Sequence, residues 1–263
     1  MTGSAPADLS IGLILPDVLG TYGDDGNALV LRRRAEMRGI RAEVVPVRLG
    51  DAVPEGLDIY TVGGGEDVAQ TIAVEHLAKD GGIRRAAAAG RQILAICAGF
   101  QIFGRTFRAG GREVEGLGLV DCETGSLPVR AIGELRTVPV SDLLSQRLTG
   151  FENHQGSTIL GPDARPLGTV VRGWGNEGPE RLVDPEDPGR DVPGGGAEGA
   201  VQGSIVCTYL HGPCLARNPE LADLLLARAM GVEPGSLEPL DLPVIDKLRE
   251  ERITARPRPK SER

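Results

Sequence analysis

Cys97 ends an apolar run of strand length and is followed by two small residues. The run covers residues 92–96, and Ala98 and Gly99 lead into a segment that predicts a short helix. This order is typical of a nucleophile held on a tight turn between a strand and a helix. The helix dipole favours the thiolate there, and the Ala98 amide is placed to face a developing oxyanion. We predict that Cys97 is a nucleophile; the alternative is an ordinary buried cysteine.

His211 is the histidine best placed to act as the base for such a cysteine. A strand-like run, residues 204–210, ends directly before it, so His211 falls at the carboxyl end of a strand, as Cys97 does. An imidazole there takes the thiol proton and later returns a proton to the leaving amine. The alternative is a structural loop histidine.

Two neighbouring cysteines offer a rival interpretation of the same segment. Cys207, His211 and Cys214 could form part of a metal site. A strand followed by a turn does not bring the two cysteines together, and no fourth ligand is evident. We therefore expect no metal.

Three consecutive glycines, Gly63 to Gly65, follow another strand-like run at residues 57–62. Glycines at the end of a strand leave amide groups free to bind an anion. A plain turn, with Glu66 or Asp67 capping the next helix, is the alternative. Because ligands bind at the carboxyl ends of strands in open α/β sheets, we expect this loop and Cys97 to face one pocket.

Alternating strands and helices around these residues predict an α/β fold with a parallel sheet covered on both faces. Expected strands are 10–15, 42–47, 57–62 and 92–96, and expected helices are 27–37 (capped by Asn27), 68–78, 82–89, 219–230 and 242–253. Beyond Gly104, shorter strand-like runs (114–120, 129–140, 156–160, 168–171 and 204–210) predict hairpins or a mixed edge to the sheet. We expect one domain over residues 8–253, a mobile loop or active-site cover at 174–200, and a disordered tail at 254–263.

The composition excludes several classes of function. The chain has 263 residues, a formal net charge of −8 and only 3% aromatic residues, which argues against a nucleic-acid or anionic-membrane surface. None of the three lysines follows a glycine, so there is no Gly-Lys-Ser/Thr phosphate loop, and nucleotide chemistry would belong to another polypeptide. No apolar run approaches 18 residues and residues 1–10 lack a signal-peptide pattern, so we expect a cytoplasmic protein without membrane insertion.

Three motifs together give the chain a family resemblance. They are Cys97-Ala-Gly-Phe-Gln101 after an apolar strand, the triple-glycine loop, and Thr208-Tyr-Leu-His-Gly-Pro213. With them the chain resembles class I glutamine amidotransferases of the cobyric-acid-synthase-like branch. More narrowly, residues 20–27 and 151–156 are similar to the glutaminase subunits of bacterial lipid II isoglutaminyl synthases. The resemblance implies a three-layer, flavodoxin-like fold with a mixed, mostly parallel sheet.

The resemblance implies roles for the motif residues. Cys97 attacks the side-chain amide of L-glutamine and forms a glutamyl thioester with release of ammonia, and His211 acts as base and acid. The amides of Ala98 and of Gly64 or Gly65 form the oxyanion hole.

Four further residues are expected to bind the substrate. Gln101 contacts the glutamine, and Asn153 and His154 line the same pocket. Arg130 is a candidate clamp for the substrate carboxylate, because a guanidinium binds a carboxylate through two hydrogen bonds. A solvent-facing strand arginine is the alternative, and Arg136 is a neighbouring competitor.

The chain departs from the class at one position. Many members carry an acid two residues after the histidine, where this chain has Pro213. The orienting carboxylate is therefore dispensable, supplied from elsewhere in the chain, or donated by a partner subunit. We favour the partner, which predicts that the isolated chain is weakly active.

By resemblance, the chain forms a heterodimer with a Mur-ligase-like synthetase subunit. That partner would hold ATP and Mg²⁺, while this chain needs no cofactor, and the ammonia would convert D-glutamate of lipid II to D-isoglutamine. Two alternatives remain open: a glutaminase for a corrinoid amide synthase, and a catalytically silent scaffold. The first usually carries a fused nucleotide-binding domain, and the second is disfavoured by the presence of both Cys97 and His211.

Overall fold

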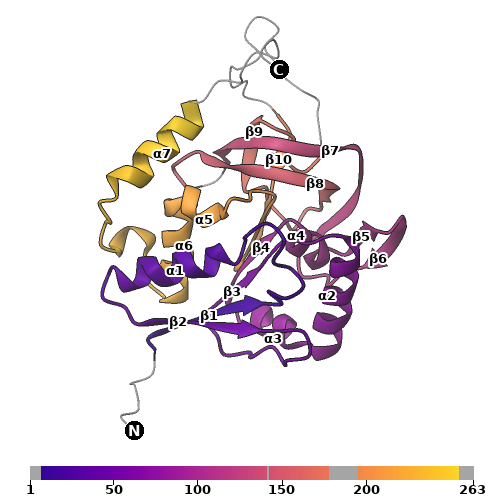
Figure 1. The fold of residues 1–263 in the computed structure, drawn as a ribbon, viewed down its shortest axis with the longest axis horizontal. Coiled ribbons are helices and arrows are strands. Elements are labelled where there is room, and N and C mark those ends of the chain that lie inside the picture. Colours follow the sequence, from indigo (N-terminus) through magenta and orange to yellow (C-terminus); the bar gives the residue numbers. More distant parts are fainter. Residues whose placement is uncertain (1–6, 141, 178–194, 255–263) are drawn as a thin grey trace, which may run out of the picture.

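Five parallel strands form the centre of the fold. The computed structural model describes residues 7–140, 142–177 and 195–254 (Figure 1). The strands of the first sheet are β1 (Leu9–Ile14), β2 (Ala42–Val47), β3 (Ile59–Val62), β4 (Gln92–Ile96), β11 (Ala200–Gln202) and β12 (Ile205–Thr208). Their order is β11-β12-β4-β3-β1-β2, and only the edge strand β11 is antiparallel to its neighbour. Strands β3, β4 and β12 are buried along their whole length, as expected for a sheet covered on both faces.

Helices form the outer layers of this sheet. They are α1 (Gly26–Glu36), α2 (Asp67–Asp80), α3 (Gly82–Ala88), α4 (Ala98–Phe103), α5 (Cys214–Arg217), α6 (Pro219–Ala229), the 3-10 helix η1 (Pro234–Ser236) and α7 (Pro243–Thr254). Helix α1 contacts α5 and α6, whereas α2 contacts α3 and α4. Right-handed crossovers place these two groups on opposite faces, because the chain moves in opposite directions along the sheet from β1 to β2 and from β3 to β4 (Figure 1). The expected three-layer α/β arrangement is confirmed.

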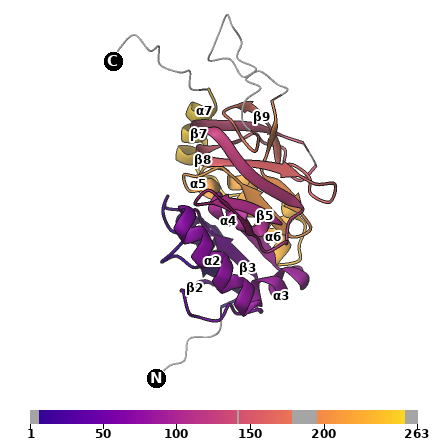
Figure 2. The same ribbon diagram turned by 90° about the vertical axis from the view of Figure 1, so that its right-hand side faces the viewer.

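A second six-stranded sheet follows α4 in the sequence. Its strands are β5 (Thr106–Ala109), β6 (Arg112–Glu115), β7 (Cys122–Pro139), β8 (Leu148–Leu160), β9 (Gly168–Arg172) and β10 (Ala197–Glu198). The order is β10-β9-β7-β5-β6, and β8 pairs with β7. Figure 2 shows β7, β8 and β9 above the first sheet, at the end of the molecule away from the N-terminus. The expected hairpins are confirmed, because β5 pairs with β6 and β7 pairs with β8 in antiparallel fashion. They form a sheet of their own, and the alternative of a mixed edge to the first sheet holds only for β11.

The long strands explain that difference. The expected short strands at 129–140 and 156–160 are parts of the longer strands β7 and β8, and β7 ends one residue earlier than expected, at Pro139. A bulge between Ser126 and Ala131 absorbs the irregularity and lets the pairing continue. The expected strand at 114–120 stops at Glu115, because the Leu117 amide donates to the Ile102 carbonyl instead.

The five predicted longer helices are all present, with ends shifted by no more than two residues. Asn27 is not a cap: α1 begins at Gly26, and the buried Asn27 side chain accepts a hydrogen bond from the Leu215 amide at 2.9 Å. A paired contact of Arg34 with Asp223, at 2.6 and 2.8 Å, fastens α1 to α6.

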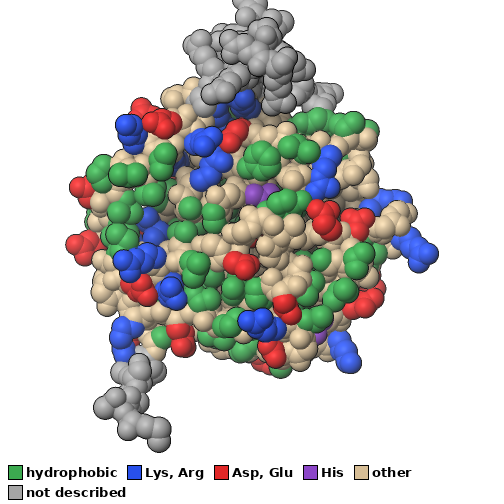
Figure 3. Space-filling view, viewed as in Figure 1, with side chains coloured by type: hydrophobic (Ala, Val, Ile, Leu, Met, Phe, Trp, Pro, Cys, Tyr) green, Lys and Arg blue, Asp and Glu red, His purple; other side chains and the backbone are tan. Residues whose placement is uncertain are grey.

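Two sequence expectations fall largely outside the described residues. They are most of the expected loop at 174–200 and the tail beyond Thr254, which itself ends α7. Within the described part of the chain, no helix is long and apolar enough to span a bilayer. On the face shown in Figure 3, basic and acidic side chains are interspersed.

Candidate active site

Four loops at one edge of the first sheet converge on the site. Cys97 follows β4, His211 follows β12, the triple-glycine loop follows β3 and Asp24 lies in the loop after β1. These four strands are neighbours and parallel, in the order β12-β4-β3-β1, so their carboxyl ends meet at one edge. The sheet therefore brings together residues that are up to 187 positions apart in the sequence.

Cys97 occupies an unusual backbone conformation. Its φ is +51° and its ψ −102°, a combination that costs about 1–3 kcal/mol for a residue other than glycine. The turn is held because the Cys97 amide donates to the Thr208 carbonyl at 2.9 Å. Gly99 is needed beside it, since a Cβ there would lie 2.8 Å from the Val62 carbonyl oxygen. The side chain, only 4% exposed, borders a cavity, and its Sγ lies 4.0 Å from the Asn153 carbonyl oxygen.

His211 is held on one side by a carboxylate. Its Nδ1 donates to Asp24, with the two carboxylate oxygens at 2.9 and 3.1 Å, which leaves Nε2 as the free nitrogen. Among the described residues Nε2 has no hydrogen-bond partner. The Cys97 side chain nevertheless lies near enough to raise the pKa of the ring. Burial lowers the pKa of His211, but the Asp24 hydrogen bond and the neighbouring Cys97 outweigh it and raise the pKa to about 10. The ring is thus a strong proton acceptor next to the thiol.

Asp24 corrects the expectation that a partner supplies the orienting carboxylate. The side chain is buried and belongs to this chain, on the loop that follows β1. A sequence signal for it existed, because the acidic loop at residues 17–26 follows a strand parallel to the one before His211. Sequence reasoning looked for the acid near the histidine along the chain, whereas the sheet supplies it from the other end of the sequence.

The predicted oxyanion hole is also revised. The Gly64 amide donates to Asp24 Oδ2 at 3.0 Å, so it anchors the carboxylate and is not available to a substrate. The amides of Gly65 and Ala98 have no hydrogen-bond acceptor within the described part of the chain. These two amides remain the candidates for oxyanion donors, and Gly65 borders the cavity beside Cys97.

The cavity next to Cys97 has a volume of about 100 Å³ and is mainly polar. It is lined by Gly65, Glu66, Asp67, Gln70, Cys97, Gln101, Arg108, Gly111, Gly125, Ser126, Arg130, Asn153, His154, Gln155 and Gly156. All four residues predicted to bind substrate are in this set. Gln101 is held on both sides of its amide group, since it contacts Gln70 and donates to the Tyr209 hydroxyl at 3.2 Å. Its carboxamide is therefore fixed in orientation.

Arg130 lies at the rim of the cavity and is bound by three neighbours. It donates to Asn153 Oδ1 at 2.6 Å, to the Tyr22 hydroxyl at 2.9 Å and to Glu66 Oε1 at 3.3 Å. The competitor Arg136 is buried and does not border the cavity.

A second arginine on the cavity wall, Arg108, escaped the sequence reasoning. It lies on β5, which turns into β6 through Gly110 and Gly111. Two consecutive glycines between short strands are a hairpin signal that could have located it.

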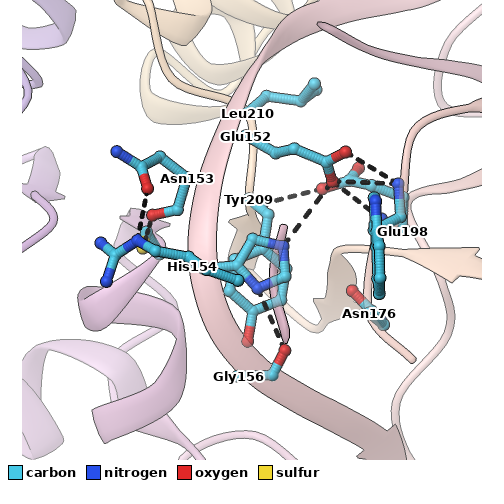
Figure 4. Close-up of polar contacts among 12 residues, drawn as sticks. Glu152, Asn153, His154, Gly156, Asn176, Glu198, Tyr209 and Leu210 are labelled. Atoms are coloured by element: carbon cyan, nitrogen blue, oxygen red, sulfur yellow. Dashed lines mark hydrogen bonds and ion pairs between the residues drawn. The ribbon is translucent and has the colours of Figure 1, made fainter. Parts of the chain in front are cut away.

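His154 lines the cavity, and Figure 4 shows it close to Tyr209, Gly156 and Glu152. Its ring stacks on Tyr209, with centroids 3.7 Å apart, and its Nδ1 contacts the Gly156 carbonyl at 3.0 Å. Nε2 lies 3.7 Å from Glu152, whose carboxylate accepts hydrogen bonds from the amides of Trp174 and Gly175. His154 therefore borders the pocket as predicted, with its polar atoms facing protein groups.

Glu198, on β10, is another buried carboxylate and lies next to Tyr209. It accepts hydrogen bonds from the Thr208 hydroxyl at 2.6 Å and the Tyr209 amide at 2.8 Å. Burial raises the pKa of Glu198 to about 7, against the lowering effect of both hydrogen bonds.

Glu198→Gln is expected to make the protein more stable above neutral pH. Because the folded-state pKa lies above the value of 4.5 for a free side chain, the stability that Glu198 contributes is full below that value. This stabilisation is lost as the pH rises through about 7, and the loss is on the order of 3 kcal/mol. Thermal unfolding should show equal midpoints for both proteins at about pH 4.5 and a higher midpoint for the variant at about pH 8. A difference that does not change with pH would contradict this.

The rival metal interpretation finds no support in the geometry. Within residues 7–140, 142–177 and 195–254, no three side chains of His, Cys, Asp or Glu come together as ligands. Cys207 and Cys214 are fully buried, and burial raises the pKa of both thiols. His211 already uses Nδ1 for Asp24.

Comparison with known proteins agrees with these features. Residues 10–219 match the CobB/CobQ-like glutamine amidotransferase domain. The chain is 34% identical over 255 residues to the subunit GatD of the glutamine-hydrolysing lipid II isoglutaminyl synthase of Streptococcus pneumoniae, covering 95% of this chain and 91% of that protein. For the same subunit of Staphylococcus aureus the identity is 33%, and the coverage is 89% and 90%.

More distant relatives share only part of their length or only the fold. The cobyric acid synthase of Desulforudis audaxviator is 30% identical over 217 residues, which cover 79% of this chain but 38% of that enzyme. Among solved structures, a glutamine amidotransferase crystal structure superposes with a TM-score of 0.51 at 18% identity, covering 84% of this chain and 99% of the other. This last likeness shows the fold.

Proposed function

The chain belongs to the CobB/CobQ-like glutamine amidotransferases, and from this membership we propose that Cys97 and His211 hydrolyse L-glutamine. The observation that carries the proposal is the placement of His211 between Asp24 and Cys97, with Nε2 free. Neither a structural histidine nor an ordinary core cysteine needs a strained turn, an adjacent polar cavity and an orienting acid at once.

The reaction follows from the arrangement of these groups. Nε2 of His211 takes the thiol proton, and the Cys97 sulfur attacks the amide carbon of glutamine. The carbonyl oxygen becomes an oxyanion that accepts hydrogen bonds from the amides of Gly65 and Ala98. The C–N bond breaks as His211 returns the proton to the leaving nitrogen, so that ammonia and a thioester form. Water, deprotonated by His211, then cleaves the thioester to release glutamate and the free thiol.

Arg130 is the proposed partner for the α-carboxylate of glutamine. Its guanidinium borders the same cavity as the Cys97 sulfur and is oriented by Asn153 at 2.6 Å. Asn153 therefore positions the arginine, and its carbonyl oxygen lies beside the sulfur. Gln101, with its carboxamide fixed, and His154 form the adjoining wall.

We further propose that the ammonia serves an ATP-dependent, Mur-ligase-like synthetase subunit in the cytoplasm. The heterodimer would amidate D-glutamate of lipid II to D-isoglutamine, with ATP and Mg²⁺ held by the partner. Support comes from the relatives of that name, which match over about nine-tenths of their length. A corrinoid amide synthase is the weaker candidate, since this chain spans only 38% of the cobyric acid synthase above.

The surface beside the cavity offers a place for the synthetase subunit. Ile132 and Phe151 are exposed apolar side chains on β7 and β8, next to Asn153 and Arg130. The backbone of Phe151 pairs with that of His211 through two hydrogen bonds of 2.8 and 3.1 Å. A partner bound here would contact β8, the strand whose backbone is hydrogen-bonded to His211.

Coexpression with the synthetase tests this proposal. We expect the full chain alone to release ammonia from L-glutamine slowly, and the complex to release it faster and to transfer it to lipid II when ATP is present. Ammonia is measured by a coupled dehydrogenase assay and the amidated product by mass spectrometry. Equal turnover with and without the partner would contradict the proposed coupling, and no ammonia from either sample would contradict the glutaminase itself.

A further inference from the structure

Glu66, a carboxylate on the rim of the cavity, has no part in the reaction described above. It lies between β3 and α2, and although it occupies the N-cap position of α2, its side chain makes no capping hydrogen bond. Instead, Glu66 Oε1 accepts a hydrogen bond from the Tyr22 hydroxyl at 2.8 Å and lies 3.3 Å from Arg130 Nη2. Glu66 and Arg130 border the same cavity as Cys97.

We propose that Glu66, assisted by Tyr22, binds the α-ammonium group of L-glutamine. This inference rests on the proposed glutaminase function and assigns the recognition of the amino-acid head group. Arg130 and Glu66 form an ion pair without net charge, and the head group of a free amino acid also carries one positive and one negative charge. On binding, the substrate carboxylate replaces Glu66 at Arg130, and the ammonium replaces Arg130 at Glu66. Each of the four charges thus keeps an opposite partner.

The exposure of the pair makes this exchange easy. The side chains of Glu66 and Arg130 are 60% and 38% exposed, so their ion pair is weak and opens readily. Tyr22 retains its proton, because burial and the hydrogen bond to Glu66 raise its pKa. Its hydroxyl can therefore continue to donate to the Glu66 carboxylate while that carboxylate holds the ammonium group.

The other acidic residue of the cavity is not available in the same way. Asp67 Oδ2 accepts a hydrogen bond from the Gly110 amide at 2.7 Å, which ties this carboxylate to the β5–β6 turn. Within the described ranges the Glu66 carboxylate, in contrast, contacts only the side chains of Tyr22 and Arg130, and Arg130 borders the cavity. Of the two carboxylates, Asp67 and Glu66, Glu66 is the one that lies beside Arg130 and can accept a further hydrogen bond.

Two truncated substrates separate this role from a structural one. Glutaramate is glutamine without the α-amino group, and 4-aminobutanamide is glutamine without the α-carboxylate. We expect Glu66→Gln to raise KM for L-glutamine by about tenfold or more with little change in kcat, since a charge-assisted contact is lost. The variant should hydrolyse glutaramate as well as the wild-type chain does, and it should lose most of the wild-type preference for L-glutamine over glutaramate.

Glu75→Gln is the matched control. Glu75 is an exposed carboxylate on α2, on the same helix but away from the cavity lining, and its replacement removes the same charge. Its kinetics with all three substrates should equal those of the wild-type chain. The measurements use the full chain, together with the synthetase subunit if that raises turnover.

Other outcomes of the substrate comparison would overturn the inference. A Glu66→Gln chain with a lower KM for L-glutamine would show that Glu66 competes with the substrate for Arg130. An unchanged preference over glutaramate would show that Glu66 does not contact the amino group. Both results presuppose a wild-type chain that hydrolyses glutamine, so they are distinct from a failure of the glutaminase proposal.

Discussion

Cys97→Ala is expected to abolish glutamine-dependent ammonia release, with a loss of about 10³-fold or more. Without the sulfur no thioester can form, and the neighbouring imidazole has no thiol to deprotonate. The backbone should not change, because alanine keeps the Cβ that already sits at φ +51°. Ammonia release, measured in the complex at saturating glutamine, checks the loss, and thermal unfolding checks the fold.

Cys122→Ala is the control for the effect of removing a thiol. Cys122 is buried in the second sheet and does not border the cavity, and burial raises its pKa to about 12, so the group stays protonated. This variant should retain the wild-type rate, even if its midpoint of thermal unfolding falls. A Cys97→Ala chain that still releases ammonia, or a Cys122→Ala chain that does not, would contradict the assignment of the nucleophile.

The sequence predicted the sheet edge well because its signals are local. An apolar strand followed by Cys97, and another followed by His211, fix two carboxyl ends of parallel strands. Parallel strands in one sheet share that edge, whatever their separation along the chain. The family resemblance then predicted chemical roles for residues that the strand pattern had already located.

The errors arose where a residue's role depends on distant parts of the chain. Asp24 precedes His211 by 187 positions, and nothing near either residue shows that they touch. The resemblance left Gly64 and Gly65 open as oxyanion donors, and the Gly64 amide donates to that same carboxylate instead. A tertiary partner thus changed the role of a correctly located residue.

The second sheet was harder to predict for a related reason. Its pairings join segments such as β7 and β9, and glycine and proline break the periodic pattern that marks a strand. Arg108 was missed with it, whereas Arg130 was found through the chemistry expected of a substrate clamp. Arg108 therefore needed the structure, while the four predicted pocket residues and the shared sheet edge of Cys97 and His211 did not.

Asp24→Asn is expected to reduce kcat by about 10²- to 10⁴-fold, the range for removing the acid that orients a catalytic histidine. An asparagine carries no negative charge to stabilise the imidazolium, and one of the two oxygens that face His211 Nδ1, at 2.9 and 3.1 Å, becomes an NH₂ group, which is itself a donor. The imidazole is then free to turn or to adopt the wrong tautomer. Steady-state kinetics of the complex measure the loss, which should fall on kcat more than on KM.

The pH dependence gives the same variant a second signature. The reactive pair of thiolate and imidazolium persists only below the pKa of the imidazolium, which Asp24 raises. Without Asp24 the upper limb of the kcat/KM profile should move to lower pH. The free energy of unfolding also depends on this pKa. Because it is raised in the folded state, the stabilisation from His211 is full below pH 6.5 and is lost as the pH rises through about 10. The variant should therefore lose most stability, relative to the wild-type chain, on the acid side of that range.

Asp25→Asn separates this effect from a general loss of negative charge in the loop. Asp25 is the neighbouring acid, at the N-cap of α1, and its side chain makes no capping hydrogen bond. Its replacement should leave both kcat and the upper pH limb in place. If Asp24→Asn also left them in place in the complex, the orienting acid would have to come from the synthetase subunit, and Asp24 would be only an anchor for the glycine loop.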